Sequence, residues 1–307
     1  MSIQYNKLFE MLSERKITKM DLKNKLGISS ATIAKLSKNE AISMKVIEDI
    51  CKVLSCQPGD IMQMEYDLEK PLLKLFREEK EMKLKGGLYH QTQIKLAYNS
   101  NRIEGSVLSE DQTRYIYETN TIAMTKDEAT PVDDIIETIN HFQCFDYMID
   151  VADQVLTESI IKEFHKLIKS NTSDSRKDWF SVGDYKQKPN MFGDNKTVLP
   201  SKVKGEMAKL LIDYNALDEV EFEDILEFHH KFECIHPFQD GNGRVGRIIM
   251  FKECLRFGIM PFIINERHKQ FYYRGLKTFE LEKGYLTDMC YSAQDEYDKL
   301  VQYFLEE

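Results

Sequence analysis

Apolar residues recur with the spacing of α-helices along most of this 307-residue chain. The first such pattern, at positions i, i+3, i+4 and i+7, is formed by Tyr5, Leu8, Phe9 and Leu12. Outside one stretch, we find neither strands alternating with helices nor an internal repeat. In that stretch, residues 182–199, Pro and Gly turn signals precede a short β-branched run, which predicts a β-hairpin. The sequence therefore predicts an all-α fold with one short hairpin.

The chain is long enough for two domains, and its charge is divided unevenly between its two parts. Residues 1–60 hold 10 Lys and Arg against 7 Asp and Glu, a net charge of +3. The rest holds 32 against 44, a net charge of −12, so the total of −9 combines two different surfaces. Pro58-Gly59 closes the first part. We therefore predict one domain at 1–65 and a second at 66–307.

The second part contains long helical patterns. A linker over 61–87 runs into a charged helix with Pro71 near its start. Further helices are predicted at about 88–103, 108–125, 131–152, 157–170, 201–217, 221–234, 242–257, 266–282 and 285–305. This part should therefore be a larger helical domain that carries the hairpin.

The first part consists of short helices around a tight turn. The segments 19–26 and 30–36 are joined by Gly27-Ile28-Ser29, and a Gly-containing three-residue turn between short helices is typical of a helix-turn-helix. Residues 22–33 resemble the Cro-like phage-repressor (XRE) helix-turn-helix family, and the match covers roughly 3–63. The alternative is a small helical bundle that serves dimerisation or peptide binding.

A helix that enters the DNA major groove needs small or basic residues on its outer face. The second helix of the turn offers such residues at Ser30, Ala31, Thr32, Lys35 and Lys38. Double-stranded DNA is therefore the expected partner of the first domain. We also expect a homodimer, because proteins of the XRE type often act as dimers.

Composition excludes several other classes. No apolar run approaches the ~18 residues of a membrane span, and the N-terminus lacks an apolar signal region. The six Cys form no CxxC pair and the seven His form no HExxH motif, so a zinc site is not expected. We expect a cytoplasmic protein with reduced thiols and no membrane contact.

The densest chemistry lies in residues 236–247, which read His-Pro-Phe-Gln-Asp-Gly-Asn-Gly-Arg-Val-Gly-Arg. Pro237 and Gly241 prevent the preceding helix from continuing. Gly241, Asn242 and Gly243 then open a new helix, whose bare N–H groups and dipole form a cradle for an anion.

Four side chains complete this pattern. Arg244 and Arg247 stand one helical turn apart and offer cations to further phosphates. Asp240 is a hard oxygen ligand placed for Mg²⁺. His236 is the one group of the motif that accepts a proton near neutral pH. Together these residues predict a nucleotide polyphosphate site with a metal and a base.

The same residues match the Fic-family signature, HPFx(D/E)GNGRxxR, at every fixed position. The resemblance extends over roughly 70–307 and implies adenylylation of a protein hydroxyl. ATP is then the substrate, Mg²⁺ is held by Asp240, and His236 deprotonates a Ser, Thr or Tyr of a target protein. The resemblance assigns nucleotide contacts to Asp240, Gly241, Asn242, Gly243, Arg244, Val245, Gly246 and Arg247.

Three other segments resemble parts of the Fic site. The family's flap, which positions the target segment, is matched by Asn190, Met191, Phe192 and Gly193. Its adenine and ribose contacts are matched by Tyr272, Tyr273 and Glu280. Its Gly-x-Tyr-Arg motif is matched by Gly183-Asp184-Tyr185-Lys186, with Lys in place of Arg.

Residues 100–105, Ser-Asn-Arg-Ile-Glu-Gly, match the family's inhibitory motif, (S/T)xxxE(G/N). The resemblance implies that Ser100, Glu104 and Gly105 form a brake on a helix at about 88–105. Glu104 pairs with Arg247, so that Arg247 cannot hold the γ-phosphate of ATP. The motif precedes the signature, as in class II of the family. The alternative is a solvent-exposed Glu before a capping Gly.

Other functions remain open at this stage. The chain could be a transcriptional regulator whose Fic region senses a nucleotide or a partner, although the intact His236 and Asp240 favour an enzyme. It could also transfer a different nucleotide, or remove AMP from a target. Because Fic proteins often self-associate, the second domain gives a further reason to expect a homodimer.

Overall fold

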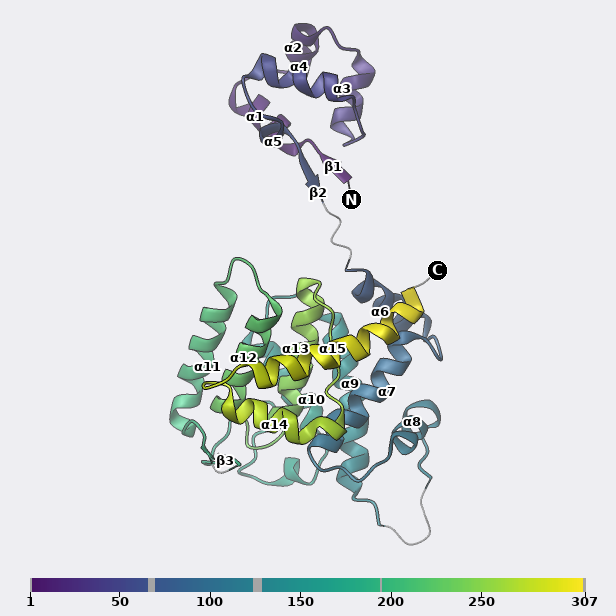
Figure 1. The fold of residues 1–307 in the computed structure, drawn as a ribbon, viewed down its shortest axis with the longest axis vertical. Helices are drawn as coiled ribbons and strands as arrows, with labels where there is room; N and C mark the ends of the chain where they lie inside the picture. The colour runs from purple at the N-terminus through teal and green to yellow at the C-terminus, as the bar shows by residue number, and fades with distance from the viewer. Residues whose placement is uncertain (1, 66–69, 124–128, 194, 306–307) are drawn as a thin grey trace. The chain divides into compact units, whose positions relative to one another are not determined.

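The computed structural model describes residues 2–65, 70–123, 129–193 and 195–305 (Figure 1). The chain forms two compact units, Met1–Glu69 and Lys70–Glu307. The boundary predicted from the sequence lies four residues earlier, next to residues 66–69, which are outside the described ranges. Helices dominate both units, so the prediction of an all-α fold is confirmed.

The N-terminal unit is a bundle of short helices. Their bounds are α1 (Asn6–Glu14), α2 (Lys19–Leu26), α3 (Ser30–Ser37), α4 (Met44–Leu54) and α5 (Pro58–Ile61). Gly27 ends α2 in the left-handed conformation, with φ of 65°, and the Ser29 side chain accepts the Thr32 N–H at 3.1 Å to begin α3. The end of α2 at Gly27 and the cap of α3 at Ser29 together form the predicted turn. Leu8, Leu22 and Leu36 are buried in the core beneath it.

A two-stranded ribbon, absent from the sequence prediction, closes this unit. Strand β1 (Ser2–Gln4) pairs antiparallel with β2 (Gln63–Glu65). Each strand has three residues, which is too short to produce a readable alternation of apolar and polar residues. The pairing joins the two ends of the unit and so depends on the folded bundle.

The C-terminal unit contains the longer helices. They are α6 (Pro71–Met82), α7 (Leu88–Ile103), α8 (Glu110–Thr119), α9 (Val132–Asp150), α10 (Glu158–Lys169), α11 (Pro200–Asn215), α12 (Phe222–Ile235), α13 (Asn242–Phe257), α14 (Lys269–Thr278) and α15 (Gly284–Leu305). Two 3₁₀ turns, η1 (Asp174–Arg176) and η2 (Glu266–His268), accompany them.

Two predicted helices are shorter in the structure. α8 stops at Thr119 because Asn120 takes the left-handed conformation that commonly ends helices. Residues 124 and 125 of that prediction are outside the described ranges. The helix predicted at 266–282 is divided into η2 and α14, and the Asn265 side chain caps the first turn. Both differences concern helix ends, where local capping decides the boundary.

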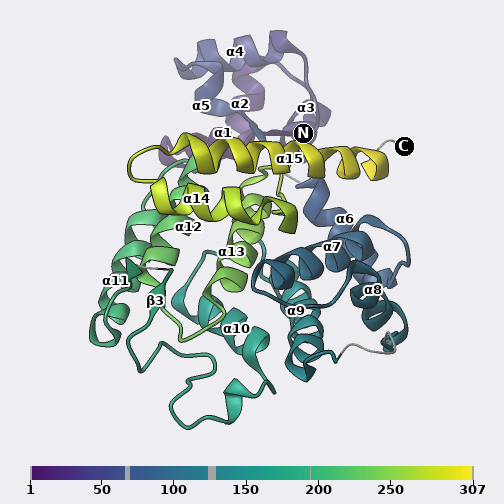
Figure 2. The same ribbon diagram turned by 60° about the horizontal axis from the view of Figure 1, so that its bottom comes forward.

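Helix α13 lies at the centre of this unit, among α7, α9, α10 and α12 (Figure 2). Its residues are buried on every face, and Phe251 packs against Phe76 and Phe145 with ring centroids 6.2 and 5.7 Å away. The helix therefore cannot shift without disturbing the main core. Its N-terminus is held in place by the same packing.

The predicted hairpin is present but small. Strand β3 (Met191–Phe192) pairs antiparallel with β4 (Asn195–Lys196), with two residues each. Asp194 and the side chain of Phe192 lie outside the described part of the structure. Within the described ranges, no helix combines the length and apolar character that crossing a membrane requires.

Candidate active site

The loop between α12 and α13 is shaped by two left-handed residues. His236 has φ of 51° and ends α12, with its N–H donated to the Phe232 carbonyl at 2.9 Å. Gly241 has φ of 82° and precedes α13. Asn242 closes the loop, because its side chain accepts the Phe238 N–H at 2.8 Å and donates to the Phe238 carbonyl at 2.9 Å. These bonds hold His236 and the N-terminus of α13 in fixed relation.

Helix α10 packs against this loop through His165. The His165 ring stacks on Phe238 with centroids 3.9 Å apart. Its Nδ1 accepts the Gly183 N–H at 3.0 Å, so its proton is on Nε2, 3.2 Å from the Asp240 carbonyl oxygen. Burial lowers the pKa of His165 to about 3, which keeps the ring neutral and suited to this bridging role.

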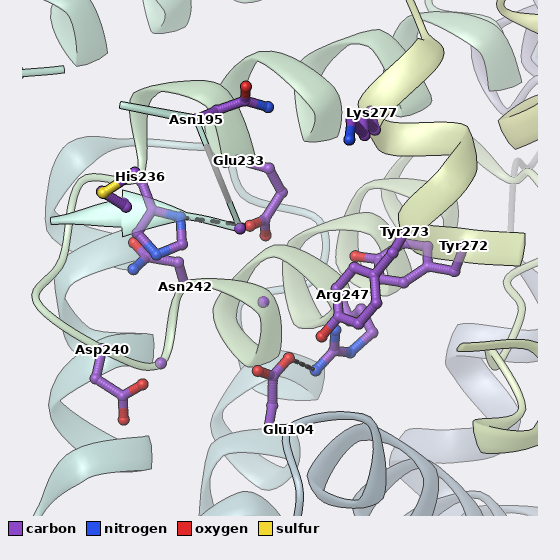
Figure 3. A pocket seen from close by; sticks show the side chains of 14 residues that line it. Glu104, Asn195, Glu233, His236, Asp240, Asn242, Arg247, Tyr272, Tyr273 and Lys277 are labelled. Atoms are coloured by element: carbon purple, nitrogen blue, oxygen red, sulfur yellow. Dashed lines mark hydrogen bonds and ion pairs between the residues drawn. The ribbon is translucent and has the colours of Figure 1, made fainter. Parts of the chain in front are cut away.

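A cavity of about 470 Å³ lies above the loop and the start of α13 (Figure 3). It gathers predicted site residues from four separate parts of the domain. These residues are Glu104, Met191, Gly193, His236, Asp240, Gly241, Asn242, Gly243, Arg247, Tyr272 and Tyr273.

Arg247 is held by the helix that carries the predicted inhibitory motif. Its Nη2 donates to Glu104 Oε1 at 2.6 Å and to the Ser100 carbonyl at 3.0 Å, and its Nε donates to the Ser100 hydroxyl at 3.0 Å. Burial opposes the charge of Arg247, but the Glu104 carboxylate raises its pKa above the usual value. A Cβ on Gly243 would lie 2.3 Å from Glu104 Oε1, so glycine leaves room for the Glu104 carboxylate in this position. Gly105 follows with φ of 107°.

Asp240 belongs to a network of charges beside the cavity. Its Oδ2 accepts from Lys169 Nζ at 2.7 Å and from Arg244 Nη2 at 3.2 Å. Lys169 also pairs with Glu137 at 2.7 Å and with Asp174 at 3.0 Å. Burial works against the charge of Asp240, yet Arg244 and Lys169 hold its pKa well below the usual range. The carboxylate is therefore ionised at neutral pH.

Sequence profiles recognise both parts of the chain. The profile of the Fic/DOC family matches residues 155–254, and that of the Cro/C1-type HTH DNA-binding domain matches residues 7–67. Both resemblances are confirmed. The chain is a Fic-domain protein. Its Fic domain follows an N-terminal helix-turn-helix domain of the Cro/C1 type.

Known proteins resemble the two domains separately. A protein adenylyltransferase Fic of Nematostella vectensis is 28% identical over 189 residues, 58% of this chain and 41% of that protein. The HTH-type transcriptional regulator YozG of Bacillus subtilis (strain 168), described as uncharacterized, is 39% identical over 66 residues, 21% of this chain and 79% of that protein. The chain thus spans about two fifths of the Fic relative's length.

A solved structure shares the fold of the larger unit. It is a Fic domain containing signaling protein from Bacteroides thetaiotaomicron VPI-5482, with a TM-score of 0.56 and 23% identity. The alignment covers 75% of this chain and 90% of that one. This likeness supports the fold of the Fic domain.

Several predicted contact residues of the Fic domain do not line the cavity. Arg244 is buried and pairs with Glu137 and Asp240 instead of facing the cavity. Val245 is fully buried in the core, so its side chain is unavailable to a nucleotide. Gly246 packs against His229 and Glu233, where a Cβ would lie 2.7 and 2.8 Å from their atoms.

Two more predicted residues lie outside the cavity. Glu280 is 80% exposed, and its nearest ionisable partner is His230 at 3.6 Å. Asn190 is at the base of the hairpin and donates to the Phe238 carbonyl at 3.0 Å. Glu280 therefore needs a movement of its side chain to reach a nucleotide, whereas Asn190 joins the flap to the loop.

Lys186, at the Arg position of the family's motif, strengthens that junction. Its ammonium donates to Asn190 Oδ1 and Thr197 Oγ1 at 2.7 Å each and to the Ile235 carbonyl at 3.4 Å. Burial lowers the pKa of Lys186 to about 8. Burial, assisted by this neighbouring cation, also lowers the pKa of His236 to about 4. His236 is therefore neutral at pH 7, as a proton acceptor must be.

The sequence prediction missed four residues at the site. Glu233, Asn195 and Lys277 line the cavity, and Lys169 holds Asp240. Glu233 stands three residues before His236. This spacing places it one turn earlier on the same face of α12, so its position at the site could have been predicted from the sequence. Lys169 carries no local signal, because it reaches Asp240 across 71 residues of sequence.

Replacing Lys169, which is 2% exposed, by Met is expected to destabilise the Fic domain by about 1.5–3 kcal/mol, because the partly exposed carboxylates of Glu137, Asp174 and Asp240 lose the cation to which they are hydrogen-bonded. Urea unfolding of the full chain measures this loss. Lys166→Met is the matched control, since Lys166 stands on the same helix with its side chain 57% exposed and should cost under about 0.5 kcal/mol. Equal, small losses in the two variants would show that the network does not stabilise the fold.

The predicted DNA-contact residues lie on α3 and, for Lys38, at its C-cap. Ser30, Ala31, Lys35 and Lys38 are exposed, and Thr32 is partly exposed. Ile33 and Leu36 face inward, against the core of the N-terminal unit. Helix α3 thus presents a small and basic face to solvent.

Proposed function

We propose that this chain is a protein adenylyltransferase, which transfers AMP from ATP to a Ser, Thr or Tyr hydroxyl of a target protein or of the chain itself. The observation that carries the proposal is one cavity of about 470 Å³ that brings together His236, the N-terminus of α13 and Arg247. A neutral base, an anion cradle and a cation are the groups that this transfer needs. The name of the Fic relatives supports the same activity.

In the proposed reaction, His236 accepts the proton of the target hydroxyl. The hydroxyl oxygen then attacks the α-phosphorus of ATP, and the bond from that phosphorus to the bridging oxygen breaks. Pyrophosphate leaves with the bonding electron pair, and AMP remains on the target. The N–H groups of Gly241, Asn242 and Gly243 stabilise the negative charge that develops on the α-phosphate. Arg247 offers its guanidinium to the outer phosphates.

Asp240 would hold Mg²⁺ in this site. Its carboxylate side chain is 49% exposed and lines the cavity, and Lys169 and Arg244 both use Oδ2. No group of three or more metal-binding side chains is found among the described residues. This donor set fits Mg²⁺, which binds to one or two carboxylates together with substrate phosphates. When bound, the metal neutralises phosphate charge.

We further propose that the nucleoside lies toward α14, beside Tyr272 and Tyr273, and that the target segment docks on the hairpin. Tyr273 is partly exposed to the cavity, and Met191 is exposed on β3. An aromatic wall suits a purine base, because its π-face accepts stacking. The exposed β3 offers a surface to the target.

Glu104 is proposed to inhibit the enzyme. It holds Arg247 at 2.6 Å and brings a negative charge to the place where the outer phosphates would bind. ATP then either fails to bind or binds with its phosphates in an unproductive position. Removal of AMP by the same site, with Glu104 assisting water, is the second activity to test.

Transfer from labelled ATP in a cell lysate tests the proposed function. The full-length Glu104→Gly variant receives ATP labelled on the α- or on the γ-phosphate, and α-labelled GTP, UTP and CTP in parallel. Adenylylation predicts protein labelling from α-labelled ATP alone, with the modified hydroxyl located by mass spectrometry. Labelling from γ-labelled ATP would indicate phosphorylation, and labelling from another nucleotide would change the substrate. Nucleotide binding without any labelling would favour a sensor.

We also propose that the N-terminal domain binds double-stranded DNA through α3, with the small and basic face toward the major groove. The exposed positions of Lys35 and Lys38 support phosphate contacts, which make binding dependent on salt. The match to the Cro/C1-type profile supports the same partner. A regulatory link between DNA binding and nucleotide binding would follow from the fusion of the two domains.

Lys35→Ala is expected to weaken binding to the DNA upstream of the chain's own coding region and to lower the slope of log K against log salt by about 1. Gel shifts over a series of salt concentrations measure both quantities. Lys45→Ala is the control, because Lys45 lies on α4 and pairs with Glu48 and Asp49. An unchanged slope for Lys35→Ala would place the phosphate contacts elsewhere.

A further inference from the structure

Glu233 occupies an unusual place for a carboxyl group. It stands on α12, one turn before His236, and is only 2% exposed. Its side chain lines the cavity and lies between His236 and Arg247 in the view of Figure 3. The carboxyl packs against α13 at Gly246, where a Cβ would lie 2.8 Å from Oε1. It therefore lies beside the proposed path of the phosphates.

The surroundings of Glu233 do not neutralise a negative charge. The charged or titratable groups that face it are Glu104 at the end of α7, Arg247 on α13, His229 and His236 on and after α12, and Tyr272 and Tyr273 on α14. Arg247, the cation among them, is already bonded to Glu104 and Ser100. His236 is 3.8 Å away and neutral at pH 7. Among the described residues, Oε1 has no hydrogen-bond partner.

A buried carboxyl with these neighbours holds its proton. Burial raises the pKa of Glu233 to about 8, the Glu104 carboxylate adds to the rise, and Arg247 offsets part of it. A protonated carboxyl has one O–H donor, and a buried donor without an acceptor is costly. The N–H groups at the start of α13 and the Arg247 guanidinium, which also line the cavity, are donors suited to phosphate, and phosphate oxygens are acceptors. An ionised carboxylate in the same place would repel that phosphate.

We propose that Glu233 binds the nucleotide as a neutral carboxylic acid, donating a hydrogen bond to a phosphate oxygen between His236 and Arg247. The inference rests on the proposed function and adds a residue that recognises the polyphosphate. Glu233 is a specificity-determining residue in this role, because it discriminates between phosphate, which accepts the bond, and groups that only donate. Its protonation makes nucleotide affinity depend on pH.

The direction of the pH effect follows from the protonation state. The donor is present at pH values below about 8 and is lost as pH rises through that value, when a negative charge appears beside the phosphates. Lys186 loses its charge over the same range and lies beside His236, so it offers a second explanation for any alkaline loss of affinity. A Gln in place of Glu233 separates the two, because it keeps an N–H donor at every pH.

Calorimetric titration with a non-hydrolysable ATP analogue and Mg²⁺ tests the inference on the full chain at pH 7.0 and 9.0. The wild type should bind about 10-fold more weakly at pH 9.0, as expected for loss of one hydrogen bond to a charged group. Glu233→Gln should bind with similar affinity at both values, and Glu233→Ala should be about 10-fold weaker than wild type at pH 7.0. Glu79→Gln, a buried glutamate on α6 outside the cavity, is the control and should follow the wild type.

Two outcomes overturn the inference. Glu233→Gln losing affinity at pH 9.0 like the wild type would assign the pH effect to Lys186. Glu233→Ala binding as tightly as the wild type at pH 7.0 would remove the hydrogen bond. If Glu233→Ala does not fold, as judged by circular dichroism, the Gln variant alone decides. Each form is also titrated with Glu104→Gly added, which frees Arg247 from its 2.6 Å pair. Absence of nucleotide binding by every form at both pH values, with and without Glu104→Gly, would instead overturn the proposed function, and the inference with it.

Discussion

His236→Ala is expected to abolish AMP transfer while ATP still binds. Without the imidazole, the target hydroxyl keeps its proton and remains a weak nucleophile, so the rate should fall by about 10²- to 10⁴-fold. Binding should be as in the wild type, because the anion cradle is made by backbone N–H groups at the start of α13 and does not include the imidazole. Single-turnover transfer from α-labelled ATP measures the first effect, and calorimetric titration measures the second.

The control for this variant is His268→Ala. His268 lies in η2 and does not line the cavity, so its removal should leave transfer unchanged. The pH profile of the wild type adds an independent check: because the pKa of His236 is lowered to about 4, transfer should fall through loss of the base only as pH drops through that value. Transfer retained by His236→Ala would refute the assignment of the base.

Glu104→Gly is expected to raise self-adenylylation by at least about 100-fold, the size of effect seen when one electrostatic contact to a transition state is restored. The variant breaks the 2.6 Å pair with Arg247 and removes a carboxylate from beside Gly243. Arg247 then turns to the outer phosphates, and the like charge that opposed them is gone. Incorporation of α-labelled ATP into the purified full chain measures the change.

Two further variants separate charge from shape. Glu104→Gln keeps the size of the side chain and removes its charge, so it should release the enzyme in part. Glu110 is a partly exposed glutamate on α8, with its side chain 41% exposed, and Glu110→Gln should leave transfer at the wild-type level. If Glu104→Gly binds nucleotide and transfers no more AMP than the wild type, Glu104 is not a brake.

The proposed inhibition by Glu104 and the proposed protonation of Glu233 are linked electrostatically. The Glu104 carboxylate helps to keep the proton on Glu233, and both groups lie near Arg247. Loss of Glu104 therefore lowers the pKa of Glu233 and moves the alkaline limit of nucleotide binding to lower pH. The pH dependence of the Glu104→Gly variant should for this reason differ from that of the wild type.

Regular elements with strong local patterns were predictable. The bounds of α7 and α13 agree with the prediction because apolar periodicity and flanking Gly residues act within one or two helical turns. The β1–β2 ribbon was not predictable, since its strands are three residues long and their paired residues are 59 to 63 positions apart. The small hairpin was predictable as a turn, but its two-residue strands depend on the Lys186 and Asn190 contacts.

The candidate site divides in the same way. The signature residues 236–247 are contiguous, so a nucleotide site could be predicted from them, and the pairing of Glu104 with Arg247 was implied by the family resemblance. The different ion pairs of Arg244 and Arg247 could not be predicted from the sequence. Both are buried on α13, yet one pairs with Glu137 below the loop and the other faces the cavity, because α9 and α7 cover different sides of the helix.

Residues close together in sequence were enough to predict a base and an anion cradle and to identify the helix-turn-helix. Charge states and orientations came from the fold. Lys169 binds Asp240, which is 71 positions away in the sequence. The pKa of Glu233 is raised by burial and by the nearby negative charge of Glu104, so its carboxyl keeps its proton. Such effects depend on distances and burial that arise when α7, α10, α12 and α13 pack together, and no single segment contains them.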